Sequence, residues 1–227
     1  MQKGVELLKS SQKLNMPTIM DEINYEGILR DNHAGVQRVS FWSSVLNGSK
    51  GFGYGANGIW QVNNDNEPFG KSPSGAAWGN IAYNKAIEFK GALDIAKSKE
   101  FLEEFEWYKL KSVDIIDSKD DIKEPSVATI DNTIFIAYFY NPIAPWDKHY
   151  TFNLEPNTLY SYFYFSPNTY QKSKKEYFTT NSSGKWQMAT PPSLDDWVLV
   201  IKSKNQSNKK NVNIVNIITS KFKKLLT

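Results

Sequence analysis

The sequence of 227 residues contains no cysteine and only two histidines, His33 and His149. The absence of cysteine excludes disulfides and thiolate-bound metals. The two histidines fall in different halves of the chain, so they give little support to a histidine metal site or a Ser-His-Asp triad. His33 is better explained as a residue at a helix start. We therefore expect neither a metal nor a cofactor.

Long apolar runs are also missing. No stretch approaches the ~18 consecutive apolar residues that a membrane-spanning helix needs. Residues 1–20 lack the apolar core of a signal peptide. The sequence therefore predicts no membrane span and no signal peptide in this chain, and it leaves the location of the protein open.

Negative charge is in slight deficit, with a formal net charge of +3. A basic tail can touch nucleic acid or an anionic surface, but a solvated tail is the commoner case, and we expect no nucleic-acid partner. Much of the positive charge comes from Lys202, Lys204, Lys209, Lys210, Lys221, Lys223 and Lys224.

The aromatic content of 14% favours β-rich structure, with carbohydrate binding as the alternative.

The first half of the chain alternates helical and strand patterns. Apolar spacing predicts helices over 3–14, 33–46 and 76–106, with a division of the last one near Ser98 and Lys99, and strands over 17–22 and 51–55. Such alternation is typical of a parallel sheet or an α/β barrel. Two strands cannot form a parallel sheet with both faces covered. The segment therefore joins a larger sheet or is a piece of something bigger.

Beyond Lys111 the pattern changes to short β-like runs separated by turn signals such as Asp131-Asn132. This spacing predicts an antiparallel β-sandwich. The aromatic strands Phe135–Tyr140 and Tyr160–Phe165 offer two faces, of which one could bind glycan or dock on the neighbouring domain, and we favour docking. We expect an α/β domain at 1–110, a β-sandwich at 111–202 and a basic tail at 203–227. The short β-like runs that make up the predicted sandwich lie at 113–116, 126–130, 133–140, 149–154, 158–165, 176–180, 185–189 and 197–202.

The strongest chemical candidates are Glu22 and Glu26, at the end of the strand predicted over 17–22. Hydrolysis of a glycosidic bond needs two carboxyl groups that flank it. Two acids four residues apart do not readily reach opposite faces of a sugar, so we expect one in the site and the other as a support of the loop. Asp21 alternates with Glu22 and is expected to face the other way.

Aromatic residues and one arginine complete the candidate site. Tyr25, Tyr54 and Trp60 lie at strand tips or loops and could shape a sugar pocket, whereas Trp42 lies in a helix and is expected in the core. Arg38 could pair with Glu22 or Glu26, or lie on the surface. The glycine-rich run at 51–55 lacks the Gly-Lys-Ser/Thr ending of a phosphate loop, which argues against nucleotide binding.

These residues together resemble the apiosidase-like glycoside hydrolases. The resemblance rests on the run from Glu22 to Gly27, on the run from Tyr54 to Trp60, on Trp107–Leu110 and on Asp195–Ile201. It covers about residues 1–202. It implies the C-terminal part of a (β/α)8 barrel followed by a small antiparallel β-sandwich, a domain that carries a collagen-binding label in this family. Nothing in the residues supports collagen binding beyond that label.

The resemblance also implies roles. Glu22 matches the nucleophile of a retaining glycoside hydrolase, and Tyr25, Glu26, Arg38, Tyr54 and Trp60 would bind substrate. The first six barrel strands and the acid/base residue have no counterpart here. We therefore expect a fragment of a bacterial enzyme, exported in its parent family, that acts on side chains of plant or cell-wall polysaccharides and is inactive alone. A separate chain with the missing barrel half is a candidate partner. The alternative is a non-catalytic β-sandwich that binds carbohydrate or matrix.

Overall fold

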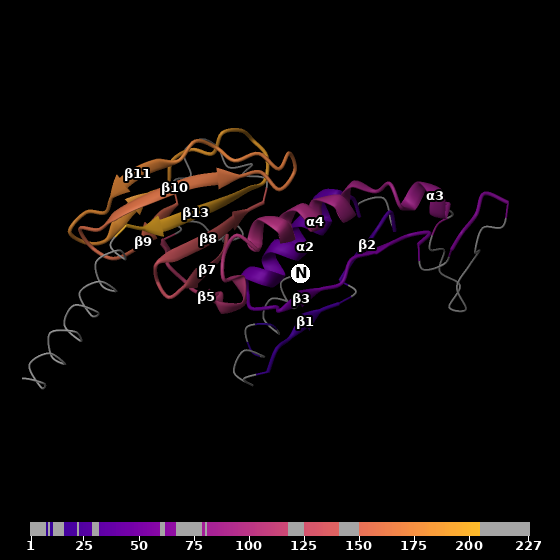
Figure 1. Cartoon of the computed structure of the whole chain (residues 1–227), viewed down its shortest axis with the longest axis horizontal. Helices are drawn as coiled ribbons and strands as arrows, with labels where there is room; N and C mark the ends of the chain where they lie inside the picture. Colours follow the sequence, from indigo (N-terminus) through magenta and orange to yellow (C-terminus); the bar gives the residue numbers. More distant parts are fainter. Residues whose placement is uncertain are drawn as a thin grey trace, which may run out of the picture.

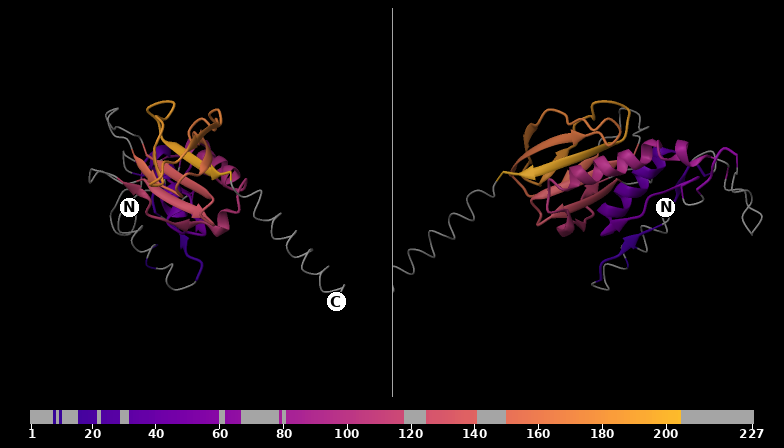
Figure 2. Two further views of the ribbon diagram at one scale, coloured as in Figure 1. Left: turned by 90° about the vertical axis from the view of Figure 1, so that its left-hand side faces the viewer. Right: turned by 45° about the vertical axis from the view of Figure 1, so that its right-hand side comes forward.

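The computed structural model describes residues 8, 10, 16–21, 23–28, 32–59, 62–66, 79, 81–117, 125–140 and 150–204. Over these residues, helices pack on one face of a six-stranded antiparallel sheet, and a three-stranded antiparallel sheet packs on its other face (Figure 1). The turned views in Figure 2 show the same contact between helices and sheet. Among the described helices, none combines the length and apolarity that crossing a bilayer requires.

Two short parallel ladders lie beside the helices. Strand β1 (Ile19–Met20) pairs with β3 (Gly51–Phe52), and β2 (Tyr25–Glu26) pairs with β4 (Gly55–Ala56). The sequence predicted both segments as strands, and the parallel pairing is the one that a strand–helix–strand unit gives. The first segment differs in detail, because it stops at Met20 and resumes at Tyr25.

The bounds of three α-helices are described, and of the helix predicted over 3–14 only Leu8 and Ser10 are described, both of them helical. Helix α2 (Ala34–Leu46) connects the two paired segments, as predicted. His33 caps it, because its Nδ1 accepts a hydrogen bond of 3.1 Å from the Gly35 amide, and Gly48, with a φ of 104°, follows its end. This confirms His33 as a helix-start residue.

The predicted helix at 76–106 is shorter and divided elsewhere. Residues 76–78 lie outside the described residues. Helix α3 (Tyr83–Ala86) precedes α4 (Lys90–Leu102), and the short 3-10 helix η2 (Trp107–Lys109) follows. The division falls between Ala86 and Lys90, so the expected break at Ser98 and Lys99 was wrong. Ser98 is fully buried within α4, so its polarity does not mark the end of a helix.

The described residues from 111 onward form strands joined by turns and loops, and these strands match the predicted runs except the first. The run predicted at 113–116 is replaced by two shorter strands, at 111–112 and 116–117. The turn residues Asp131 and Asn132 both have left-handed φ angles, which asparagine and aspartate tolerate. The strands are β5 (Lys111–Ser112), β6 (Ile116–Asp117), β7 (Ser126–Ile130), β8 (Ile134–Phe139), β9 (Thr151–Asn153), β10 (Leu159–Phe165), β11 (Glu176–Thr179), β12 (Lys185–Gln187) and β13 (Trp197–Ser203).

The six-stranded sheet has the order β11-β10-β13-β8-β7-β5, and the three-stranded sheet has the order β12-β9-β6. Successive side chains of a strand point to opposite faces, so each central strand of the larger sheet supplies two cores. Phe152 of β9 and Trp186 of β12 pack on one face, in a core with Tyr162 and Leu199.

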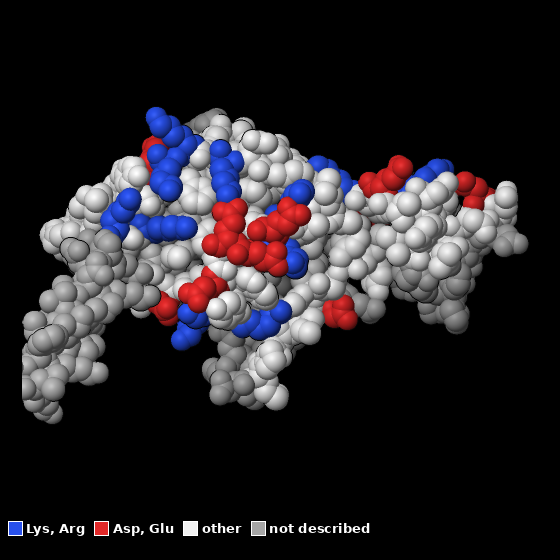
Figure 3. Space-filling model, in the orientation of Figure 1, with Lys and Arg blue, Asp and Glu red and all other residues white. Residues whose placement is uncertain are grey.

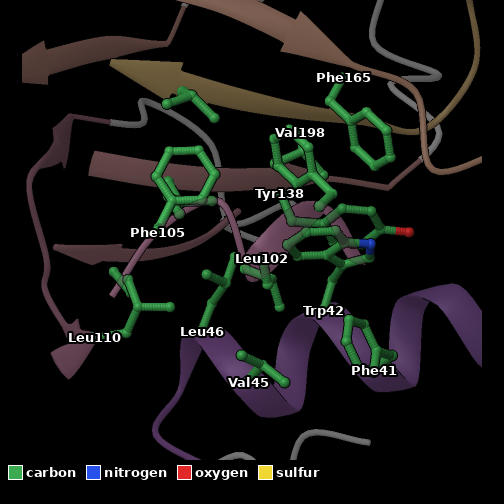
Figure 4. Close-up of a cluster of buried hydrophobic side chains, with 14 of the residues drawn as sticks. Phe41, Trp42, Val45, Leu46, Leu102, Phe105, Leu110, Tyr138, Phe165 and Val198 are labelled. Carbon is green, nitrogen blue, oxygen red and sulfur yellow. The ribbon is translucent and has the colours of Figure 1, made fainter. Parts of the chain in front are cut away.

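The opposite face of the large sheet packs against the helices (Figure 4). Trp42 of α2 is fully buried and stacks on Tyr138 of β8, with ring centroids 6.0 Å apart. Phe101 of α4 stacks on Phe165 of β10 at 4.0 Å. The aromatic strands therefore dock on the helical part, as we favoured from the sequence. One core crosses position 110, where the sequence placed a domain boundary.

Candidate active site

A pocket of about 200 Å³ opens at the carboxyl ends of β1 and β3, where the second parallel ladder begins. In sheets of parallel strands, this end is where ligand sites form. The pocket is lined by Asp21, Tyr25, Gly53, Tyr54, Gly55, Ala56 and Ile59.

The pocket forms because the two paired segments have different numbers of residues between the β1–β3 ladder and the β2–β4 ladder. The register Met20↔Phe52 is followed by Tyr25↔Gly55, so four residues on one side (21–24) face two on the other (53–54). The glycines allow the close approach. A Cβ added at Gly55 would lie 2.6 Å from the Tyr25 ring, and one at Gly53 would collide with Asp21. The glycine-rich run is thus explained by contact with side chains of the first segment.

Glu26 is buried directly behind the pocket, with 6% of the residue exposed. Its Oε2 accepts a hydrogen bond of 2.8 Å from the Tyr54 hydroxyl, and its Oε1 accepts one of 3.3 Å from the Gly91 amide. Gly91 lies in the first turn of α4, whose N-cap residue has no side-chain hydrogen bond. Glu26 therefore supplies an acceptor to a helix N-terminus, where the helix dipole favours negative charge.

The same contacts set the pKa values of this pair. Burial raises the pKa of Glu26, and the bonds from Tyr54 and Gly91 only partly oppose this. Burial and the neighbouring carboxylate raise the pKa of Tyr54 as well. Tyr54 is therefore a neutral hydroxyl fixed by Glu26, and its ring forms part of the pocket wall. The prediction that Glu26 supports the loop agrees with this geometry.

Arg38 has partners that the sequence did not suggest. Its Nε and Nη2 bond both oxygens of Asp196 at 2.7 and 3.0 Å, and its Nη1 bonds Asp94 at 2.6 Å. The Arg38 side chain is 10% exposed, and those of Asp94 and Asp196 are 0% and 2% exposed. Burial alone would lower the pKa of Arg38, but the two carboxylates outweigh it and raise that pKa. Arg38 is therefore a buried ion-pair residue, and the surface alternative was wrong.

Further polar groups complete this cluster. Lys90 and the Tyr170 hydroxyl bond Asp94 at 2.5 and 2.6 Å, and the Tyr138 hydroxyl bonds Asp196 at 2.9 Å. The cluster joins α2 and α4 to the large sheet. Sequence reasoning missed Asp94, Tyr138 and Tyr170. Asp196 was noticed only within the motif at the last strand, because 158 positions separate it from Arg38.

The other predicted site residues are placed differently. Tyr25 and Tyr54 both line the pocket, and Glu26 holds Tyr54. Glu22 and Trp60, predicted as nucleophile and substrate-binding residue, lie outside the described residues. Asp21 lines the pocket, and its expected orientation away from Glu22 stays a prediction, because Glu22 lies outside the described residues. Strand β1 ends at Met20, so the alternation behind that expectation does not continue to Asp21.

No group of three or more histidine, aspartate or glutamate side chains suited to a metal occurs among the described residues. The described polar groups at the pocket are a carboxylate, two phenols and the glycine backbone, and they lie beside the apolar side chains of Ala56 and Ile59. Such groups suit a polar, hydroxyl-rich ligand. Carboxyl groups are also the groups that hydrolysis of a glycosidic bond uses.

The fold resembles part of two solved structures that are named glycoside hydrolases. One solved structure described as a glycoside hydrolase has a TM-score of 0.66, 17% identity, and coverage of 89% of this chain and 46% of its own. A glycoside hydrolase family 5 structure from Bacteroides vulgatus ATCC 8482 has a TM-score of 0.68 and 20% identity, and the match covers 89% of this chain and 45% of that structure. This chain therefore spans less than half the length of these structures.

A family model matches the first part of the sequence. Residues 2–109 match the family described as apiosidase-like, catalytic domain, which confirms the resemblance that the motifs predicted. No curated protein matches the chain. The structural likeness covers 89% of the chain and so extends beyond the family match into the β-rich half.

Proposed function

We propose that this chain carries the nucleophile half of a retaining glycoside hydrolase site and that Glu22 is the nucleophile. The observation that carries the proposal is the pocket at the carboxyl ends of β1 and β3. Its lining includes Asp21 and Tyr25, which stand on either side of Glu22 in the sequence, and Tyr54 from the neighbouring segment.

In this chemistry the nucleophile carboxylate attacks the anomeric carbon and forms a glycosyl ester as the bond to the leaving oxygen breaks. A second carboxyl group protonates that oxygen and then activates the water that hydrolyses the ester. The described residues around the pocket offer Asp21 beside Glu22 but no acid facing it from across the pocket. We assign the acid/base to the first six barrel strands, which have no counterpart among the described residues.

The other predicted site residues have different roles in this proposal. Tyr25, Tyr54 and Trp60 form the substrate wall, and Glu26 fixes the Tyr54 hydroxyl. Arg38 is a positioning residue, because it holds α4 through Asp94, and the first turn of α4 in turn bonds Glu26. The segment predicted as a β-sandwich, residues 111–202, contributes the large sheet that packs on the helices next to the site.

The proposal predicts that the chain alone does not turn over aryl glycosides, since water activation needs the absent carboxyl group. The measurement is release of the aryl group over a panel of sugars, for this chain and for Glu22→Gln. Turnover by the unaltered chain that is lost in Glu22→Gln would support Glu22 as the nucleophile and would refute the prediction that the chain alone is inactive. Turnover that Glu22→Gln leaves unchanged would refute the nucleophile.

The substrate we propose is a side chain of a plant or cell-wall polysaccharide, as the family resemblance implies. A separate polypeptide with the first barrel strands is the proposed partner. Adding such a half should produce turnover that depends on Glu22. A folded half that binds this chain without producing any activity would count against the assignment of the pocket.

A further inference from the structure

The helices leave one end of the large sheet uncovered. On the helix side of the sheet, Lys202 of β13, Ser161 of β10 and Tyr177 of β11 form one row across three strands. Lys204 bonds Leu159 through its amide at 3.0 Å and extends the same face by one row. Tyr177 is 57% exposed and Leu159 43% exposed, so this end presents an open surface.

Lysines gather on this surface. The Lys202 Nζ lies 4.5 Å from the centre of the Phe105 ring, and the Lys204 Nζ lies 5.0 Å from the centre of the Tyr177 ring. Figure 3 shows basic side chains collected over β10, β11 and β13, with acidic side chains beside them over the end of α4. We name Leu159, Lys175, Tyr177, Lys202 and Lys204 the lysine face.

The positive charge of the lysine face is not neutralised within the described part of the chain. Lys172, at its border, is paired with both oxygens of Glu104 at 2.5 and 2.7 Å. Lys175, Lys202 and Lys204 form no ion pair with another described residue.

The lysines are close enough to repel one another. Burial lowers the pKa of Lys202, and the charges of Lys175 and Lys172 lower it further, against the opposing effect of Glu104. A bound anion would relieve this repulsion.

We propose that the lysine face binds an acidic polysaccharide. Its carboxylates pair with the lysines, and one sugar ring lies on the exposed ring of Tyr177. The choice of carbohydrate rests on the proposed function, whereas the face itself is defined by charge and exposure. It is a second site, formed by the strands β10, β11 and β13, and it does not include the pocket residues at β1–β4.

Two other occupants fit less well. Proteins that hold single-stranded nucleic acid stack successive bases on several aromatic rings, and the lysine face presents one exposed ring. The chain's own residues 205–227 contain five lysines and no acidic residue. Like charges would repel that segment from the face.

The test measures binding of an oligogalacturonide to the full chain by titration calorimetry, beside the same oligosaccharide with its carboxyl groups methyl-esterified. We expect binding of the acidic form only. The double variant Lys202→Gln/Lys204→Gln should weaken it by roughly tenfold, from two surface charge contacts together. Lys204→Gln alone, at an exposed position, should weaken it less and serves if the double variant does not fold.

Tyr108 provides a matched control for Tyr177. It is 58% exposed, and Lys109 lies 5.9 Å from its ring centre, but it belongs to η2 and not to the lysine face. Tyr177→Ala should weaken binding and Tyr108→Ala should not. Equal binding of the esterified form, full binding by the double lysine variant, equal loss from both tyrosine variants, or tighter binding of an oligothymidylate would each overturn the proposal.

The same titration separates the two proposals. Glu22→Gln should bind the oligogalacturonide as the unaltered chain does, because the lysine face is formed by β10, β11 and β13. Binding of the oligogalacturonide, together with no covalent reaction or turnover that depends on Glu22, would support the lysine face and refute the hydrolase proposal. Covalent reaction at Glu22 without binding at the face would support the hydrolase proposal and refute the lysine face.

Discussion

Replacing Arg38 by methionine tests whether the buried ion cluster holds the helices to the sheet. The substitution keeps most of the apolar stem and removes the charge. The carboxylates of Asp94 and Asp196, whose side chains are 0% and 2% exposed, then lose the guanidinium group that bonds both of them. Breaking a buried pair in this way typically costs about 3–5 kcal/mol, because the remaining charges stay desolvated. The free energy of unfolding should fall by about that amount.

An exposed ion pair elsewhere in the chain provides the control. Lys85 lies 3.7 Å from Asp65, with side chains that are 70% and 62% exposed. Pairs of this kind contribute about 0–1 kcal/mol, so Lys85→Met should be nearly neutral. Both variants are compared with the unaltered chain by urea unfolding, followed by tryptophan fluorescence and far-ultraviolet circular dichroism.

The two probes should report one transition, since a single core contains both helices and sheet. A double-mutant cycle completes the test. Asp196→Asn should cost less in the Arg38→Met background than alone, because the charge it removes is already unpaired there. The reasoning fails if Arg38→Met is as mild as Lys85→Met, or if the two substitutions at the cluster are additive.

Three further predictions concern the core and the pocket. Trp42→Ala, at a fully buried position, should cost about 3–5 kcal/mol in urea unfolding; a loss under about 1 kcal/mol would contradict the shared core. Gly91→Ala should destabilise, although alanine usually stabilises a helix interior by about 0.5–1 kcal/mol, since its Cβ would collide with the Glu26 carboxylate; a gain in stability would contradict that contact. Glu26 has a raised pKa, so its folded form holds its proton to higher pH than its unfolded form. The unaltered chain should therefore lose stability relative to Glu26→Gln as the pH rises above 4.5, the ordinary pKa of glutamate, and a difference that stays constant with pH would refute the raised pKa of Glu26.

Much of the secondary structure could be predicted from the sequence because it depends on local patterns. The short β-like runs at β7, β8, β10 and β13, separated by turn signals, identified each strand. His33 and Asn47-Gly48 marked the ends of α2. Trp42 was expected in the core, since it lies on the apolar side of a helix. The docking of the aromatic strands followed from their having two apolar faces.

Other features depend on contacts between distant residues. Nothing near Arg38 in the sequence points to Asp196, and an arginine in a helix is equally compatible with a surface position. The hydrogen bond from Tyr54 to Glu26 spans 28 positions and depends on the unequal advance of the two paired segments. Ser98 suggested a break because its polarity is visible in the sequence and its burial is not.

The central claim is that the pocket holds the nucleophile Glu22, and covalent labelling tests it most directly. An activated 2-fluoroglycoside carries a leaving group that departs without protonation, so the absent acid is not needed, and without the base the glycosyl ester should persist. Peptide mapping by mass spectrometry locates the ester. We expect a single adduct on Glu22 across a panel of sugars, and none in Glu22→Gln. An adduct on Asp21 or Glu26 with Glu22 unmodified, or no adduct with any sugar, would contradict the claim.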